Sequence, residues 1–146
     1  MSDRMDEIML RLMRQRNDDH SLEAKSGGGK LDKGFWSTVS AFANTDGGLI
    51  VLGVEEDQAT GTFRVNPDFD PRAANDRLIS GFSAGQDKPP VTPIPKTQIE
   101  VDEFEGKPVI LIDVFPMRGD SELGQRMPCY VTAQGLQSGA YKRVLD

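Results

Sequence analysis

The stretch S-A-F-A-N-T-D-G-G-L-I-V-L-G at residues 40–53 decides the fold, because it joins a helix to a buried strand through one tight turn. Apolar residues recur at helical spacing over 33–43, which predicts a helix with one face on a core. Gly47 and Gly48 then end the helix, since adjacent glycines accept the positive φ of a sharp reversal. The run 49–52 has no polar gap, so we expect a central strand covered on both faces.

Three acidic residues, Glu55, Glu56 and Asp57, follow this strand almost at once. In sheets that carry helices, ligands tend to bind beyond the carboxyl ends of the strands. The sequence therefore predicts carboxylates at the edge of a candidate site.

The remaining patterns predict a chain of mixed α and β structure. Helical periodicity predicts helices over 3–16 and 72–82, with Pro71 in the first turn of the second helix. Strand patterns occur at 21–25, 62–65, 98–104, 107–115, 129–132 and 140–144, and residues 83–95 indicate a loop. We expect one α+β domain over 1–146, a mixed β-sheet packed by two to three helices.

Composition excludes several classes of protein. No apolar run approaches a membrane span, and the first residues, M-S-D-R-M-D-E-I, lack the apolar segment of a signal peptide. Cys129 is the one cysteine, which excludes an internal disulfide and a cysteine zinc site. His20, the one histidine, is typical of a surface residue rather than of a general base. We therefore expect a cytoplasmic protein without a membrane contact.

Charge limits how this chain could bind a nucleic acid. The net charge of −6 argues against a general binder, because affinity for phosphates comes largely from Lys and Arg. The acidic excess lies in residues 34–146, so any such surface is a local patch. On the helix 3–16, Arg4, Arg11 and Arg14 form either a solvated face or a ridge that contacts phosphates.

The segment S-G-G-G-K at 26–30 is a candidate phosphate site. It lacks the spacing of a P-loop, so it gives only a weak signal for a nucleoside triphosphate. Three glycines before a helix can still present several backbone N–H groups, with positive charge from Lys25, Lys30 and Lys33. The alternative is a flexible connection that binds nothing.

Several of these blocks resemble one known family, the Schlafen AlbA-2 domain. Glu23-Ala24-Lys25 is similar to its E-F-K, residues 40–48 to its S-A-F-A-N-T-x-G-G, and L-G-V-E-E at 52–56 to its I-G-V-D-D. Weaker agreement continues in P-C-Y at 128–130 and Y-K-R at 141–143. Ala24 departs from the usual Phe. The family supplies DNA-binding domains to bacterial regulators and forms the core of Schlafen nucleases.

The resemblance implies a metal site made of carboxylates. The three acids of the nuclease branch correspond here to Asp18, Glu23 and Glu56, a set that suits Mg²⁺ or Mn²⁺. The first acid is one methylene shorter than in the family and the last one longer. Glu55 or Asp57 is the alternative third member. The alternative role for Glu23 is an ion pair with Lys25 or with an arginine across the sheet. The closing basic residue of the family falls at Lys142 and Arg143, and we expect these two side chains to contact a phosphate backbone.

Two functions remain open at this point. One is a small metal-dependent endonuclease acting on structured RNA such as tRNA. The other is a non-catalytic DNA-binding module of a bacterial transcriptional regulator. An assembly domain, acting through a homodimer or a protein partner, is a third reading that the acidic composition supports.

Overall fold

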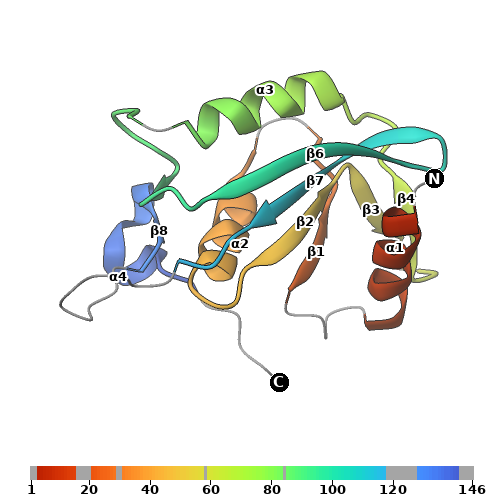
Figure 1. Ribbon diagram of the computed structural model, residues 1–146, viewed down its shortest axis with the longest axis horizontal. Coiled ribbons are helices and arrows are strands. Elements are labelled where there is room, and N and C mark those ends of the chain that lie inside the picture. Colours follow the sequence, from red (N-terminus) through yellow and green to blue (C-terminus); the bar gives the residue numbers. More distant parts are fainter. Residues whose placement is uncertain are drawn as a thin grey trace.

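The computed structural model describes residues 3–15, 21–28, 31–57, 59–83, 85–117 and 128–141. A four-stranded sheet with the order β1-β2-β7-β6 forms its centre (Figure 1). The strands are β1 (Leu22–Lys25), β2 (Gly48–Leu52), β7 (Lys107–Val114) and β6 (Thr97–Phe104). β1 is parallel to β2, whereas β2 with β7 and β7 with β6 are antiparallel. The sheet is therefore mixed and β2 is internal, as the sequence predicted.

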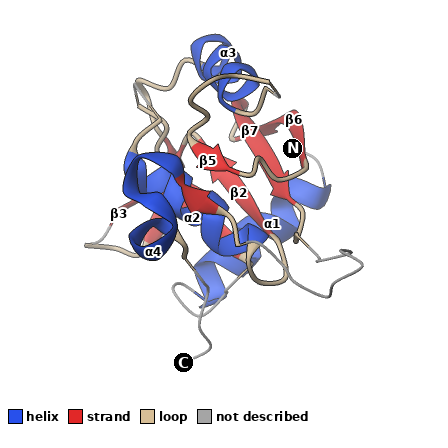
Figure 2. Ribbon diagram, turned by 90° about the vertical axis from the view of Figure 1, so that its left-hand side faces the viewer, coloured by secondary structure: helices blue, strands red, loops and turns tan. Residues whose placement is uncertain are grey.

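Three helices cover the two faces of this sheet, so an apolar layer lies on each side. α1 (Asp3–Gln15) packs on one face, and α2 (Lys33–Ala43) packs on the other together with α3 (Pro71–Gly81). In Figure 2, α1 and α2 lie on either side of β2. The predicted α+β fold of a single domain is confirmed.

Side-chain alternation along β2 explains why its apolar run has no gap. Leu49 and Val51 belong to the cluster under α1, while Ile50 and Leu52 belong to the cluster under α2 and α3. A strand covered on both faces buries every side chain, so the period of two disappears from its sequence.

Two small two-stranded sheets flank the main one. β3 (Val54–Asp57) pairs with β4 (Thr62–Val65), and β5 (Val91–Thr92) pairs with β8 (Tyr130–Val131). The chain bends between β2 and β3 at Gly53, whose φ of 104° is readily adopted by glycine. Its Cβ would stand 2.6 Å from the Phe69 ring, so no larger side chain fits there.

The turn after α2 uses its two glycines for different reasons. Gly47 has a φ of 81° and donates its N–H to the Phe42 carbonyl at 2.8 Å, which ends the helix. Gly48 lies under the Phe42 ring, where a Cβ would come within 2.7 Å of three ring atoms. The reversal predicted from the sequence is confirmed, and only Gly47 needs a positive φ.

Ser40 and Asn44 join α2 to the end of the described chain. Asn44 accepts the Cys129 N–H at 2.7 Å and donates to the carbonyls of Cys129 and Tyr141 at 2.7 and 2.9 Å. The Ser40 hydroxyl donates to the Cys129 carbonyl at 2.8 Å and accepts the Tyr141 N–H at 3.1 Å. These bonds hold a segment about 90 residues distant in sequence against the helix.

The chain near β8 differs from the prediction. The strand predicted over 129–132 shortens to β8, and a 3-10 turn (Thr132–Gln134) leads into the short helix α4 (Gly135–Gly139). The predicted strand at 140–144 is represented by a single bridge between Ala140 and Tyr130, and its residues from 142 onward lie outside the described part. None of the described helices has the length and apolarity that a membrane crossing requires.

Candidate nucleic-acid interface

Glu23 lies on β1 and faces α2. Leu22 and Ala24 pack toward α1, so alternation turns Glu23 and Lys25 to the opposite side. The Thr38 hydroxyl, one turn into α2, donates to Glu23 Oε2 at 2.9 Å. Lys25 Nζ lies 3.8 Å from Glu23 Oε1, and 31% of the Glu23 side chain is exposed. The ion pair with Lys25 is therefore formed, and the carboxylate is oriented at a surface that solvent reaches.

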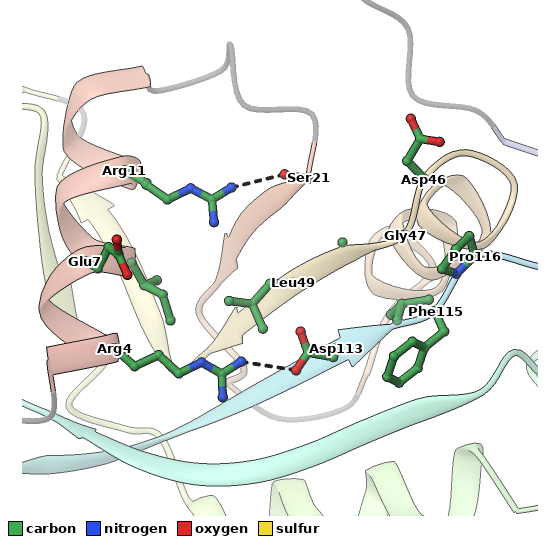
Figure 3. A pocket seen from close by; sticks show the side chains of 13 residues that line it. Arg4, Glu7, Arg11, Ser21, Asp46, Gly47, Leu49, Asp113, Phe115 and Pro116 are labelled. Carbon is green, nitrogen blue, oxygen red and sulfur yellow. Dashed lines mark hydrogen bonds and ion pairs between the residues drawn. The ribbon is translucent and has the colours of Figure 1, made fainter.

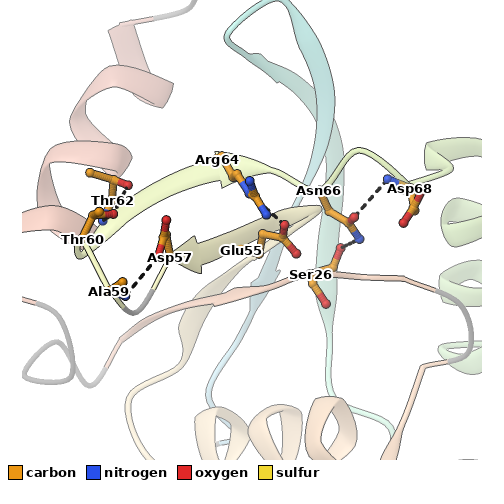
Figure 4. Close-up of polar contacts among 9 residues, drawn as sticks. All are labelled: Ser26, Glu55, Asp57, Ala59, Thr60, Thr62, Arg64, Asn66 and Asp68. Carbon is orange, nitrogen blue, oxygen red and sulfur yellow. Dashed lines mark hydrogen bonds and ion pairs between the residues drawn. The ribbon is translucent and has the colours of Figure 1, made fainter.

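The acids of β3 lie on a separate hairpin (Figure 4). Glu55 accepts a hydrogen bond from Arg64 Nε at 3.0 Å, and Asp57 accepts the Ala59 N–H at 3.0 Å within the turn. Glu56 is exposed and stands opposite Phe63 in the register.

Alternation in the hairpin separates Glu56 from its neighbours. Val54 is buried in the cluster under α1, and Phe63, the cross-strand partner of Glu56, packs against the same cluster. Glu56 therefore shares the α1 side of the chain, whereas Glu55 lies on the side that Glu23 faces. Glu55 and Glu56 therefore point to opposite sides of the hairpin, so at most one of them can face a site that includes Glu23.

The predicted set of Asp18, Glu23 and Glu56 cannot be assembled from the described residues, since Asp18 lies outside them. Within the described ranges, no three His, Cys, Asp or Glu side chains are grouped closely enough to hold a metal ion. Glu23 fits the role of one ligand because its carboxylate is oriented and partly exposed. The three-carboxylate site stays a prediction.

The glycine-rich segment forms a small hollow at the start of α2. The hollow has a volume of about 80 Å³ and is lined by Lys25, Ser26, Gly27 and Gly28 together with the first turn of the helix. Asn66 donates to the Ser26 carbonyl at 3.1 Å and so ties this segment to the end of β4 (Figure 4). The described part, 26–28, is therefore held by the fold.

Two predicted cations lie near the start of α2, together with the carboxylate of Asp32. A Cβ at Gly34 would stand 3.8 Å from Lys25 Nζ, so the ammonium lies beside the first turn. Lys33 is exposed as the first residue of the helix, while Asp32 accepts the Phe35 N–H at 2.9 Å as the N-cap. Lys30, Lys142 and Arg143 lie outside the described residues. Of the five predicted cations, Lys25 and Lys33 thus lie among the described residues, both near the start of α2.

A larger cleft on the α1 side is a feature that the sequence reasoning missed (Figure 3). Its volume is about 390 Å³, and α1, the start of β2 and the end of β7 line it. Arg4 forms ion pairs with Asp113, at 3.1 Å, and with Glu100, while Arg11 donates to Ser21 Oγ at 3.0 Å. Arg4 and Arg11 therefore both contact neighbouring side chains, while the side chain of Arg14 lies outside the described ones. In the sequence, the only sign of this cleft was the i, i+7 spacing of Arg4 and Arg11, which places both on one side of the helix.

Comparison with known proteins gives one family and one informative structure. The family described as Schlafen, AlbA_2 matches residues 18–146. The N-terminal domain of a protein from Nitrosomonas europaea, related to the ATP-dependent DNA helicase RecG, is similar with a TM-score of 0.64 at 23% identity. That similarity covers 99% of this chain and 90% of the other, and at this identity it concerns the fold alone.

Weaker similarity links the chain to the DIP2311 protein of Corynebacterium diphtheriae, with a TM-score of 0.44 and 14% identity. The match covers 90% of this chain and 25% of that one. No curated protein matches. Because the family match spans most of its length, this chain belongs to the Schlafen AlbA_2 family.

Proposed function

We propose that this chain acts on nucleic acid, and that it is a metal-dependent endonuclease for structured RNA such as tRNA. The observation that carries the proposal is the position of Glu23. Its carboxylate is oriented by Thr38, partly exposed, and placed beside Lys25 at the glycine-rich start of α2. A carboxylate for a metal and a cation for a phosphate thus lie next to each other.

Electrostatics support a local rather than a general surface. The chain has a net charge of −6, so a polyanion is attracted only where cations concentrate. The N-terminus of α2 adds the positive end of its dipole to Lys25 and Lys33. Lys30, Lys142 and Arg143 are the further cations that we assign to this surface.

Asp18, Glu23 and Glu56 are the residues that we propose as metal ligands, with Glu55 as the alternative to Glu56. Mg²⁺ or Mn²⁺ held by such carboxylates would polarise a phosphodiester and lower the pKa of a water molecule. Thr38 keeps the Glu23 carboxylate in one orientation through its hydrogen bond. Lys25 offsets part of the carboxylate charge where the phosphate would approach.

The test is cleavage of labelled tRNA and DNA by the purified chain with Mn²⁺ or Mg²⁺, with and without a chelator. Glu23→Gln keeps the size of the side chain but removes its charge. We expect it to lower the cleavage rate by at least about 100-fold, since loss of residues supporting a metal ligand alone costs roughly 10–100-fold. Glu103→Gln, at an exposed position of β6, is the matched control and should leave the rate unchanged.

A second candidate is the non-catalytic DNA-binding module. The observation that favours it is the fold shared with the N-terminal domain of the RecG-related protein over 99% of this chain. Such a module would bind DNA with an affinity that falls steeply with salt and is indifferent to chelator. Binding of this kind without any cleavage, for the native chain and Glu23→Gln alike, would replace the nuclease proposal. Light scattering with and without RNA tests the homodimer reading in the same samples.

A further inference from the structure

The ring of Tyr141 lies along α2, and its hydroxyl reaches the first half of this helix. The backbone of Tyr141 is held at the second half, since its N–H donates to Ser40 Oγ at 3.1 Å and its carbonyl accepts from Asn44 Nδ2 at 2.9 Å. The hydroxyl lies beside Ser37 and near Lys33, which precede Ser40 by about one and two turns. The side chain therefore runs toward the first turn of α2, with its ring packed against the core.

The charge near this hydroxyl suits an anion. Lys33 is exposed at the start of α2, and its ammonium is close enough to act on the Tyr141 phenol. Within the described part of the chain, Lys33 forms no ion pair, whereas three other cations there each have a carboxylate partner. The neighbouring carboxylate of Asp32 is turned to the helix end, where it accepts the Phe35 N–H. Lys33 is thus a cation that a ligand can neutralise.

The Tyr141 hydroxyl can give its proton to a ligand and still keep a partner. It donates to Gln134 Oε1 at 2.8 Å, and its bonds with Ser37 and Gln134, together with the charge of Lys33, lower the pKa of the phenol. The amide of Gln134 has donors as well as an acceptor, so it can turn and donate to the phenol oxygen instead. The phenol proton is then available to an anion beside Lys33.

The Tyr141 hydroxyl and the Glu23 carboxylate lie on different sides of α2. Thr38 donates to Glu23, whereas Ser37 lies beside Tyr141. Successive residues of a helix are turned by about 100° from each other, and a helix with its side chains is about 10 Å wide, so one phosphate does not reach both groups. The exposed Gly34 lies one turn before this pair and has no side chain that would block a strand between them.

We infer that Tyr141 and Lys33 bind a second phosphate of the nucleic-acid strand, across the first half of α2 from Glu23. The phenol donates a hydrogen bond to a phosphate oxygen, and Lys33 supplies the opposite charge. Such contacts fix the path and register of a strand and carry no sequence information. The inference rests on the proposed action on nucleic acid, and it gives Tyr141 a role in binding the strand rather than in cutting it.

The test is the affinity of the purified chain for labelled tRNA and single-stranded DNA, measured by fluorescence anisotropy with a chelator that prevents metal-dependent cleavage. Tyr141→Phe keeps the packed ring and removes only the hydroxyl. We expect the affinity to fall about tenfold, as for loss of a hydrogen bond to a charged group. Tyr130→Phe is the matched control. Tyr130 bridges Ala140, so alternation turns its side chain away from that of Tyr141, and its change should leave the affinity unaltered.

Salt dependence separates the contributions of the two side chains. Lys33→Gln removes a charge, so the slope of log affinity against log salt concentration should become shallower by about 0.7–0.9. Tyr141→Phe removes a neutral group and should leave that slope unchanged, which a general disturbance of the surface would not do. Lys107→Gln, at the exposed start of β7, is the control for charge and should change neither affinity nor slope.

A double variant tests whether the two side chains bind the same phosphate. In that case each single change already weakens the contact of the other side chain. The loss of affinity in Tyr141→Phe with Lys33→Gln should then be at least about twofold smaller than the product of the two single losses. Losses that multiply fully would show two independent contacts and would overturn the inference.

The remaining outcomes separate this inference from the proposed function. A Tyr141→Phe variant that binds like Tyr130→Phe would overturn the inference and leave the proposed function in place. A native chain that binds neither tRNA nor DNA would end both. Urea unfolding checks that each variant is folded. If Tyr141→Phe is not, Lys33→Gln decides, because unchanged affinity and slope in that variant would also overturn the inference.

Discussion

The hydrogen bonds of Asn44 are the strongest test of how this fold is held together. Replacing Asn44 with Ala removes the acceptor of the Cys129 N–H and the donor to the Tyr141 carbonyl. The Cys129 carbonyl keeps a partner, because the Ser40 hydroxyl also donates to it at 2.8 Å. Two backbone groups at the end of the described chain therefore lose their bond to α2.

The expected cost follows from those two groups. A buried polar group left without a partner costs about 1–3 kcal/mol. Cys129 is fully buried, so the unpaired N–H of this residue should cost an amount near the upper limit of that range. Tyr141 is half-buried, so its carbonyl can bind water and should cost less. We expect Asn44→Ala to lower the free energy of unfolding by about 2–4 kcal/mol.

Urea unfolding followed by circular dichroism measures this loss as a lower midpoint with an unchanged slope. Asn75→Ala, on the half-buried side of α3, is the control and should stay within about 0.5 kcal/mol. The Cys129 amide should also lose protection from hydrogen exchange in Asn44→Ala. If the variant matches the control in its midpoint, these hydrogen bonds do not stabilise the fold and the reasoning is refuted.

Two further changes test packing and burial. In urea unfolding, Gly53→Ala should destabilise the fold by about 1–3 kcal/mol more than Gly106→Ala. Both glycines have a positive φ, but only at Gly53 would a Cβ come within 2.6 Å of the Phe69 ring. Equal losses of stability in the two variants would exclude this clash. Burial raises the pKa of the Cys129 thiol from 9.0 to about 12, so the folded chain should resist iodoacetamide at pH 8 and react once urea unfolds it. Because burial disfavours the thiolate, the contribution of Cys129 to stability is complete below pH 9 and is lost between pH 9 and about 12. Rapid labelling of the folded chain at pH 8 would contradict the burial of this thiol.

The sequence predicted those helices and strands whose signals lie within a few neighbouring residues. The helix over 33–43 has the predicted bounds, because its apolar period and the glycines after it act within a few residues. The strand patterns at 98–104 and 107–115 are β6 and β7, and the two residues between them, Glu105 and Gly106, both have a positive φ. β5 and α4 were not predicted, since two strand residues or five helical ones carry no readable period.

For the candidate sites, too, the sequence predicted only what local motifs record. The family motif identified Glu23, and the alternative that it pairs with Lys25 is formed in the structure. Which of Glu55 and Glu56 shares its side depends on the bend at Gly53 and on the packing of Val54, neither of which a motif records. The cleft combines residues from α1, the turn at Asp46 and the end of β7, so it exists only once the chain is folded.

The sequence by itself determined the helix, the turn and the buried strand of residues 33–52, the α+β class and the membership of a family, because these follow from periodicity and from residue types at short range. Only the tertiary structure decided what the polar residues of that motif do. Ser40 and Asn44 face inward and bind the backbone near Cys129, about 90 residues away, so they hold two ends of the fold together. The physical reason is that a polar side chain finds its partner by position in space, which depends on the packing of the whole sheet and its helices.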